Sequence, residues 1–293
     1  MTLRYGQVQR SAMNWPFYVA TELGLFAENG LVVEPTIFTS TRDPVAALTD
    51  GSLDVINVIP DVTLAAIENG APLCIIANSN DRPQYRLMVQ PGIRDFSDLK
   101  GHTVGVNDGR SGETLILRRI MRAKGLAPSS YELLACGPPP ERCKTLKGGV
   151  IAGTLVTQPF DLMLEEEGFR VLASSAEVIP SYPFTVCVVR RQAALNEDVV
   201  SFLKCIKKAW QWMADSSHRQ RSAATLSRFT NTTQKQAEGT YDLYLTSPSP
   251  PSLAPTLKGI TTVLELLVEG GQFPAPIPPA EKYVDHRYVQ QLG

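Results

Sequence analysis

The sequence predicts an α/β protein with two lobes. Apolar, strand-like runs alternate with amphipathic segments over the first 80 residues, and the same alternation starts again at residue 102. The chain of 293 residues is long enough for two domains of ordinary size. Because this spacing is typical of parallel sheets, the carboxyl ends of the strands should share one edge, and small ligands bind at such edges.

Four strands are predicted in the first lobe, with helices between them. Pro16 suits the first turn of the first helix, and Gly24 ends that helix. Ser40 and Pro44 introduce the second helix, and Asp61 begins the third. The four strands are expected at residues 3–8, 32–38, 53–58 and 73–77.

The second lobe is predicted from residue 89 to residue 186, and residues 1–88 and 187–293 form the first lobe. In this interpretation the run 86–89 leaves the first lobe, and the β-branched run 185–189 returns to it. Strands are expected at 102–106, 133–136, 150–156 and 169–173, and helices at 113–124, 197–218, 223–229 and 257–269.

Charge and composition exclude several classes of partner. With 28 basic and 29 acidic residues the net charge is −1, so neither nucleic acid nor an anionic membrane is an expected partner. No run approaches the ~20 apolar residues that span a bilayer, so direct membrane insertion is not expected. The five cysteines form no metal-ligand pattern, and we expect no metal and no cofactor. We expect a monomer.

Several segments resemble one family of receptors. Residues 24–34 follow the pattern G-F/L-F-x-x-x-G-L-x-V-E, residues 99–106 resemble D-L-K-G-K-x-V-G-V, and residues 70–73 resemble G-x-P-L. Residues 146–149 and 158–160 resemble a later segment of the same family. Together they resemble the nitrate/sulfonate/taurine-type, thiamine-precursor-like solute-binding proteins of ABC transporters, which have the type II periplasmic-binding-protein fold.

The resemblance implies two α/β domains joined by a two-strand hinge, with a ligand cleft between them. It implies capture of a small molecule, either anionic (a sulfonate or carboxylate) or heteroaromatic, and a transporter permease as partner. The location would be periplasmic or lipid-anchored if a signal segment was removed, and cytoplasmic if Met1 is the native start. The family's second-lobe Asp is missing from Gly149–Gly153, whereas Asp54 keeps the equivalent position in the first lobe.

The expected ligand contacts lie in loops that precede helices, because helix N-termini favour anions. The loops 11–15, 40–42 and 109–114 have this form, and Trp15 could stack on a ligand. Simple helix capping by Ser40 or Ser111, and hinge packing by Tyr182, are the alternatives. The predicted contacts are Asn14, Trp15, Ser40, Thr41, Arg42, Asp61, Arg110, Ser111, Gly112, Thr114, Gln158 and Tyr182.

A cytoplasmic enzyme on the same scaffold, such as a desulfinase, decarboxylase or pyrimidine-precursor synthase, is the alternative function. The resemblance to the synthase calls for a His in the first ligand loop and a cysteine-rich run, and neither is present. Cys143, between Arg142 and Lys144, comes nearest to the setting of a nucleophile. A plain helix position is the alternative for it, and we expect no catalytic residue. A ligand-sensing regulatory domain is not expected, because the sequence has no helix-turn-helix segment.

Overall fold

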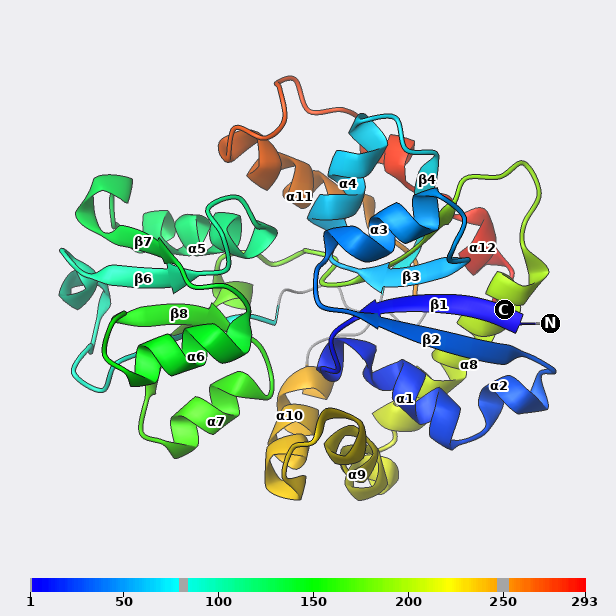
Figure 1. Cartoon of the computed structure of the whole chain (residues 1–293), viewed down its shortest axis with the longest axis horizontal. Helices are drawn as coiled ribbons and strands as arrows, with labels where there is room; N and C mark the ends of the chain where they lie inside the picture. Colours follow the sequence, from blue (N-terminus) through cyan, green and yellow to red (C-terminus); the bar gives the residue numbers. More distant parts are fainter. Residues whose placement is uncertain (1, 79–83, 247–252) are drawn as a thin grey trace. The chain divides into compact units, whose positions relative to one another are not determined.

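Two five-stranded sheets, one in each of two compact units of the chain, form the core of the fold (Figure 1). The computed structural model describes residues 2–78, 84–246 and 253–293. Unit 1 comprises Met1–Asp81, Tyr182–Thr261 and Pro278–Gly293, and unit 2 comprises Arg82–Ser181 and Thr262–Ile277. The predicted α/β class is confirmed.

The sheet of unit 1 has the strand order β2-β1-β3-β10-β4. β1 is parallel to β2 and β3, whereas β10 lies antiparallel between β3 and β4. The strands of the first 80 residues therefore all run in one direction, as predicted, and the returning strand is inserted among them. These strands are β1 (Thr2–Val8), β2 (Val32–Phe38), β3 (Val55–Val58), β4 (Leu73–Asn78) and β10 (Val186–Arg190).

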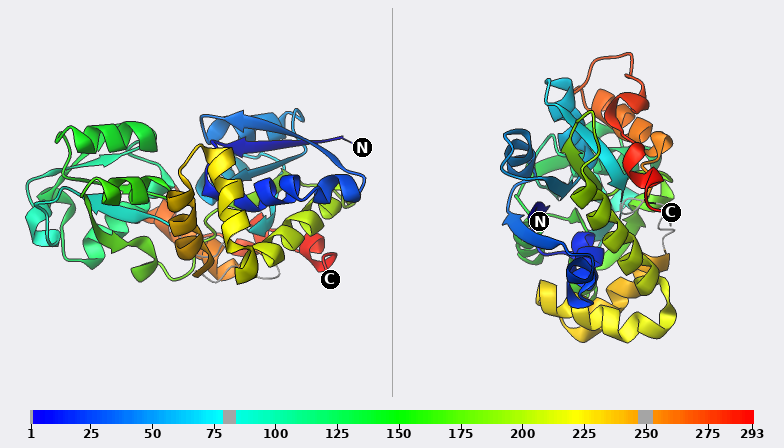
Figure 2. Two further views of the ribbon diagram at one scale, coloured as in Figure 1. Left: turned by 90° about the horizontal axis from the view of Figure 1, so that it is seen from below. Right: turned by 90° about the vertical axis from the view of Figure 1, so that its right-hand side faces the viewer.

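Helices cover both faces of this sheet (Figure 1). One face carries α3 (Arg42–Thr49) and α4 (Pro60–Glu68), and the other carries α1 (Trp15–Glu22) and α8 (Glu197–Ala214). The second face holds an extensive apolar cluster, in which Tyr5, Phe17 and Phe202 pack ring to ring. Figure 2 shows α9 (Arg219–Thr230) next to α1. The other helices of unit 1 are α2 (Leu25–Glu28), α9 (Arg219–Thr230), α10 (Gln234–Thr246) and α12 (Arg287–Gln290), and α11 (Leu257–Glu269) begins in this unit.

The sheet of unit 2 has the order β7-β6-β8-β5-β9. β6 is parallel to β7 and β8, and β5 is antiparallel to β8 and β9. α6 and α7 pack on one face of it and α5 lies on the other (Figure 1). The elements are β5 (Arg86–Val89), β6 (Thr103–Val106), α5 (Gly112–Ala123), β7 (Glu132–Ala135), α6 (Pro139–Lys147), β8 (Gly153–Val156), α7 (Phe160–Glu166) and β9 (Arg170–Ser174). Short 3-10 helices cover Ala12–Asn14, Phe96–Leu99, Pro128–Ser130, Ser175–Glu177, Ser216–His218 and Ala280–Tyr283.

The unit boundaries differ from those that the sequence predicts. The expected boundary after residue 88 falls inside β5, whose partners β8 and β9 both belong to the second sheet. Residues 262–277 also belong to unit 2, although their sequence position suggests the first lobe. They are held there because Glu269 pairs with Arg119 at 2.5 Å and Gln272 Nε2 donates to the carbonyl of Arg110 at 2.6 Å.

Gly153 permits the close pairing of β8 with β5. A Cβ at this position would lie 2.9 Å from Val89 Cγ1 and 3.1 Å from the carbonyl oxygen of Met88. We expect Gly153→Ala to lower the free energy of unfolding by about 1–3 kcal/mol, because the strand pair must separate. Denaturant unfolding measures this loss. Gly92→Ala is the control, since a Cβ there meets nothing within 4 Å. Equal stability of the two variants would contradict the packing described.

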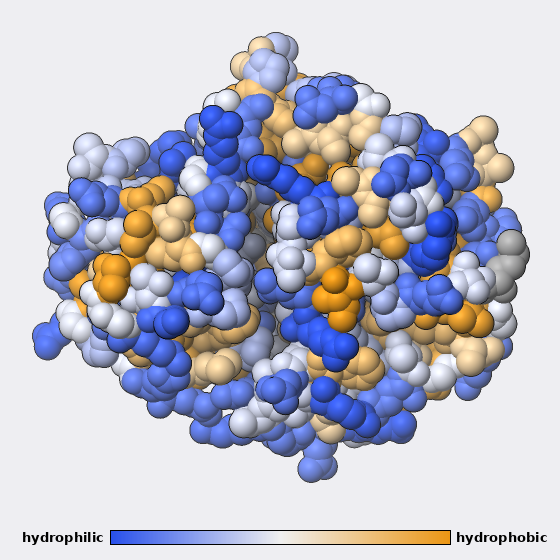
Figure 3. All heavy atoms as spheres, in the orientation of Figure 1, coloured by the Kyte–Doolittle hydropathy of each residue, from blue (hydrophilic) through white to orange (hydrophobic). Residues whose placement is uncertain are grey.

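The surface in Figure 3 is largely hydrophilic, with apolar atoms in small groups. Among the residues that the structure describes, the exposed large apolar side chains are Val32, Ile37, Leu134, Val150 and Ile277. No helix in the described part of the chain is long and apolar enough to cross a membrane. The described residues also include no group of three or more His, Cys, Asp or Glu side chains that could hold a metal ion.

Candidate ligand-binding residues

Four buried polar side chains gather at the carboxyl ends of β1 and β3. Gln7 and Asn57 are register partners near the ends of these strands, so their side chains share one face of the sheet. Ser11 and Asn14 belong to the turn that follows β1. All four are at most 7% exposed. We call Gln7, Ser11, Asn14 and Asn57 the strand-end cluster.

Asn14 occupies the centre of this cluster. Its Oδ1 accepts hydrogen bonds from the Tyr5 hydroxyl at 3.2 Å and from Asn57 Nδ2 at 2.9 Å. Its Nδ2 donates to the carbonyl of Gln9 at 3.3 Å. Asn57 Nδ2 also donates to the carbonyl of Met13 at 3.2 Å. These bonds attach the turn after β1 to the end of β3 and fix the orientation of both carboxamides.

The strand-end cluster presents polar atoms that have no partner within the described chain. These atoms are Gln7 Oε1, Ser11 Oγ and Asn57 Oδ1. For Asn57 the assignment of oxygen and nitrogen is settled, because its Nδ2 already faces two acceptors. A buried acceptor without a donor costs about 1–3 kcal/mol, and such groups in proteins usually bind water or a ligand. The cluster is therefore suited to a molecule that donates hydrogen bonds.

Trp15 has a structural role that differs from the predicted one. Its side chain is 0% exposed, and its indole N–H donates to the carbonyl of Ser222 at 3.1 Å. The ring packs against Tyr241 and Tyr244, with centroid distances of 6.0 and 5.8 Å. Stacking on a ligand does not fit this burial, because both faces of the ring are surrounded by core. Phe17, which is 5% exposed, belongs to the same apolar cluster as Trp15.

The remaining predicted residues of unit 1 lie in different settings. Ser40 Oγ accepts from the amide of Arg42 at 3.1 Å, which is the local turn expected from the alternative interpretation. Thr41 is half-buried at the start of α3, and the Arg42 side chain is exposed. Asp61 is buried in the first turn of α4, directly after β3, and Tyr182 is buried where the chain returns to unit 1. Ligand contacts of these residues stay predictions.

In unit 2 the hydroxyl groups of the predicted loop cap helix α5. Ser111 Oγ accepts from the amide of Thr114 at 3.4 Å, and Thr114 Oγ1 donates to the carbonyl of Asp108 at 2.5 Å. Gly112 is buried as the first residue of the helix, whereas the Arg110 side chain is exposed. The two hydroxyls that the sequence offers as ligand donors are thus occupied in shaping the loop. The backbone of Arg110 is also bonded, since its amide donates to Asp108 Oδ1 and its carbonyl accepts from Gln272 Nε2, and a ligand contact of the exposed Arg110 side chain stays a prediction.

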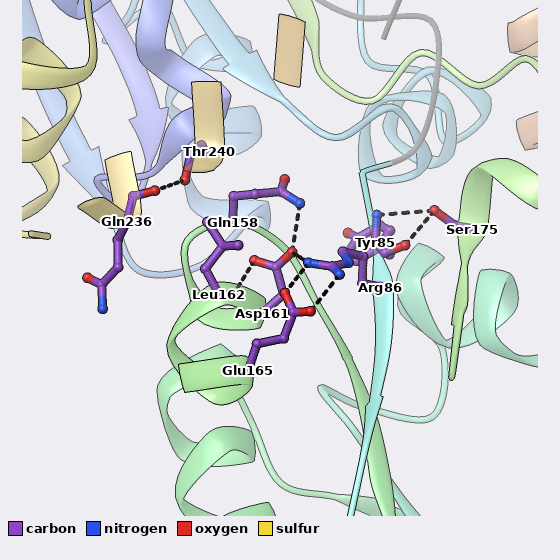
Figure 4. Close-up of polar contacts among 9 residues, drawn as sticks. All are labelled: Tyr85, Arg86, Gln158, Asp161, Leu162, Glu165, Ser175, Gln236 and Thr240. Atoms are coloured by element: carbon purple, nitrogen blue, oxygen red, sulfur yellow. Dashed lines mark hydrogen bonds and ion pairs between the residues drawn. The ribbon is translucent and has the colours of Figure 1, made fainter. Parts of the chain in front are cut away.

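Gln158 belongs to a polar network at the start of α7 (Figure 4). Its Nε2 donates to Asp161 Oδ2 at 2.9 Å, and the same oxygen accepts from Arg86 at 2.9 Å. Arg86 also reaches Glu165 at 2.7 Å. Burial raises the pKa of Asp161 despite the adjacent Arg86. Gln158 is only 3% exposed, so the structure shows it as a support for this network.

Glu113 and Arg142 form an ion pair beneath the same loop of unit 2. Arg142 Nη2 lies 2.6 Å from Glu113 Oε2, and the two side chains are 1% and 10% exposed. Burial raises the pKa of Glu113 to about 7, although the charge and hydrogen bond of Arg142 act in the opposite direction. Neither residue is among the contacts that the sequence predicts.

The buried cysteines Cys74, Cys143 and Cys187 lack the features of a nucleophile. Cys143 is 8% exposed, and burial raises the pKa of its thiol to about 11. Burial likewise raises the pKa of the Cys74 thiol to about 11 and that of Cys187 to about 12. Because a nucleophilic thiol needs a lowered pKa and access to substrate, Cys143 fits the alternative of a plain helix residue.

The family's acidic position has a structural explanation. Asp54 lies just before β3, at the amino edge of the sheet, away from the strand-end cluster. Its carboxylate accepts two side-chain hydrogen bonds from Arg4, at 2.6 and 3.0 Å. The corresponding position of unit 2 is Ala152, which follows Ile151, a residue buried in an apolar cluster, and directly precedes β8. The missing Asp therefore affects the residues just before β8, at the amino edge of the second sheet, and not the carboxyl edge of that sheet.

Comparison with known proteins identifies the family. A family model described as NMT1/THI5 like matches residues 12–219, more than two thirds of the chain. The chain belongs to this family. The match covers Asn14, Asn57, Glu113 and Arg142, whereas Gln7 and Ser11 lie before its first residue.

The bicarbonate transport ATP-binding protein CmpC of Synechocystis sp. is 28% identical over 226 residues, which are 69% of this chain and 34% of that protein. The chain thus spans about a third of the length of this curated relative. Among solved structures, a ligand-binding component of an ABC-type import system from Staphylococcus aureus, with zinc bound, has a TM-score of 0.83 at 16% identity and covers 100% of this chain and 99% of its own.

The periplasmic aliphatic sulphonate binding protein SsuA of Escherichia coli has a TM-score of 0.79 at 18% identity, over 97% of this chain and 92% of its own. These structural likenesses confirm the two-lobed periplasmic-binding-protein fold that the sequence predicts.

Gln7 and Asn57 carry a signal that sequence reasoning missed. Each is a polar residue near the carboxyl end of an otherwise apolar strand run, Gly6-Gln7-Val8 and Val55-Ile56-Asn57-Val58. A carboxamide in such a run is costly unless its polar atoms have partners. This position, rather than the loop composition, is the feature that points to the cluster.

Proposed function

We propose that the protein is a solute-binding receptor that captures a small molecule for an ABC importer. The observation that carries this proposal is the set of buried acceptor atoms in the strand-end cluster, at the sheet edge where ligands bind in α/β folds. The fold and the family support it, because structures of this fold include the ligand-binding component and the sulphonate binding protein described above.

The two groups of polar residues suggest the chemistry of the ligand. Gln7 and Asn57 offer carbonyl oxygens, which call for N–H or O–H donors on the molecule. The loop before α5 offers the N-terminus of a helix of 12 residues and the exposed Arg110, which favour an anionic group. We therefore propose a small anion, a sulfonate or carboxylate, or a heteroaromatic molecule, in either case carrying hydrogen-bond donors. Capture between the two lobes is part of this proposal.

The biological setting follows from the same proposal. The protein would act as a monomer, deliver its ligand to a transporter permease and work outside the cytoplasm. The words periplasmic and import system in the names of these two structures support the location and the permease partner of this proposal.

A thermal-shift panel tests the proposed function. Candidate ligands are taurine and alkanesulfonates, nitrate, bicarbonate, aromatic carboxylates and aminopyrimidines. A ligand at 100 times its Kd adds about 2.7 kcal/mol to the free energy of unfolding, so the Tm should rise by several degrees. Absence of any shift across the panel would count against the proposal.

Asn57→Leu tests whether the strand-end cluster binds the selected ligand. We expect its Kd, measured by calorimetry, to rise at least tenfold, because one hydrogen bond to the ligand is lost and Asn14 loses a donor. Asn29→Leu is the matched control, since Asn29 is exposed and bonds only within its own turn. An unchanged Kd for Asn57→Leu would remove the cluster from the site.

A further inference from the structure

The buried pair of Glu113 and Arg142 connects three segments at the carboxyl edge of the second sheet. Glu113 belongs to the first turn of α5, and Arg142 reaches it from α6. Arg142 Nη1 donates to the carbonyl of Gly137 at 2.8 Å, and its Nη2 donates to the carbonyl of Leu155 at 3.0 Å. One guanidinium therefore joins the first turn of α5, the loop after β7 and the strand β8.

Both side chains of the pair are buried, so water cannot stabilise a change in the charge of Glu113. Counted over the whole residue, backbone included, Arg142 is 0% exposed and Glu113 is 8% exposed. Glu113 Oε1 and Arg142 Nε have no hydrogen-bond partner within the described chain. The bond between Glu113 Oε2 and Arg142 Nη2 is thus the polar link between the first turn of α5 and the α6 side chain, and charge assistance makes such a bond strong.

We propose that Glu113 is a positioning residue whose charge state sets the conformation of the loop 107–112. In the charged state the carboxylate holds the first turn of α5 against Arg142. In the protonated state this link weakens while Arg142 keeps its bonds to Gly137 and Leu155. That a ligand contacts this loop rests on the proposed function. The effect of the Glu113 charge on the loop conformation does not.

The groups that act on Glu113 place its transition near neutral pH. Burial has the largest effect and raises the pKa of Glu113, and the charge of Asp108 raises it further. The charge and hydrogen bond of Arg142 and the backbone amide of Asn107 lower it. The resulting pKa of Glu113 is about 7. Because this value exceeds the usual value of 4.5 for the unfolded chain, the protonated form favours folding. The contribution is complete below about pH 4.5 and is lost as the pH rises through 7.

Nuclear magnetic resonance of the ligand-free protein tests the proposal directly. We expect the side-chain carboxyl carbon of Glu113 and the amides of Gly109 and Gly112 to titrate together, with a midpoint between pH 6 and 8. Glu113→Gln should abolish the amide titration, and the exposed Glu132→Gln is the control that should retain it. A midpoint near 4.5, or amides that still titrate in Glu113→Gln, would overturn the proposal.

A stability measurement gives a second readout that does not depend on resonance assignment. The Tm of the native protein should fall relative to that of Glu113→Gln between pH 5 and 8, because only the native carboxyl loses its proton in this range. Parallel Tm profiles would overturn the proposal. Neither experiment uses a ligand, so its failure is distinguishable from failure of the proposed receptor function.

Discussion

Replacing Arg142 by methionine is expected to lower the free energy of unfolding by about 3–5 kcal/mol at pH 8. The variant leaves the Glu113 carboxylate buried without a cation, and the carbonyls of Gly137 and Leu155 lose their donor. At pH 6 the loss should be smaller, because Glu113 can then take up a proton and enter the core as a neutral group. Denaturant unfolding at the two pH values measures both effects.

Two comparisons isolate the cause of this loss. Arg122→Met removes a 60% exposed guanidinium that lies 3.5 Å from Glu269, and surface pairs contribute only about 0–1 kcal/mol. The double variant Glu113→Gln/Arg142→Met should be more stable than Arg142→Met at pH 8, because no buried charge is left. A loss below about 1 kcal/mol for Arg142→Met would show that the pair does not hold the three segments together.

Trp15→Ala is expected to destabilise unit 1 by about 3–5 kcal/mol, the usual cost of removing a large buried aromatic side chain. The variant loses the bond to the carbonyl of Ser222 and the contacts with Tyr241 and Tyr244. Its matched control is Trp212→Ala, which removes a half-buried ring stacked on His218 at 4.2 Å. We expect the control to lose about 1 kcal/mol, since less apolar area is exposed.

Ligand affinity separates the two interpretations of Trp15. If the ring belongs to the core, Trp15→Phe should keep the affinity of the folded protein within about threefold, because stability rather than recognition changes. A large loss of affinity in a variant that stays folded, by calorimetry at a temperature well below its Tm, would restore the predicted stacking role.

Much of the fold is predictable from apolar periodicity. The strand at 32–38 and the helix at 257–269 agree with β2 and α11 residue for residue. A clear stop before β2, Gly30 with its positive φ of 67°, and the apolar residues that recur on one face of 257–269 explain this agreement. The segment 139–147 gives no such signal, because the buried face of α6 consists of Arg142, Cys143 and Leu146.

The site is less predictable, because its groups meet only in the folded chain. A hydroxyl such as that of Ser111 can either cap a helix or bind a ligand. Here it caps α5, because the first backbone N–H groups of a helix have no acceptors within the helix. Glu113 and Arg142 are 29 residues apart and look like ordinary charged helix positions in the sequence. Gln7 and Asn57 come together only through the pairing of β1 with β3.

A crystal structure with the ligand selected by the thermal-shift panel would show whether the strand-end cluster recognises a small solute. We expect a donor atom of the ligand within hydrogen-bond distance of Asn57 Oδ1 or Gln7 Oε1, two acceptors that have no partner in the described chain. A ligand bound elsewhere, for example at the amino edge of the sheet beside Asp54 and Arg190, with ordered water on Asn57, would contradict it.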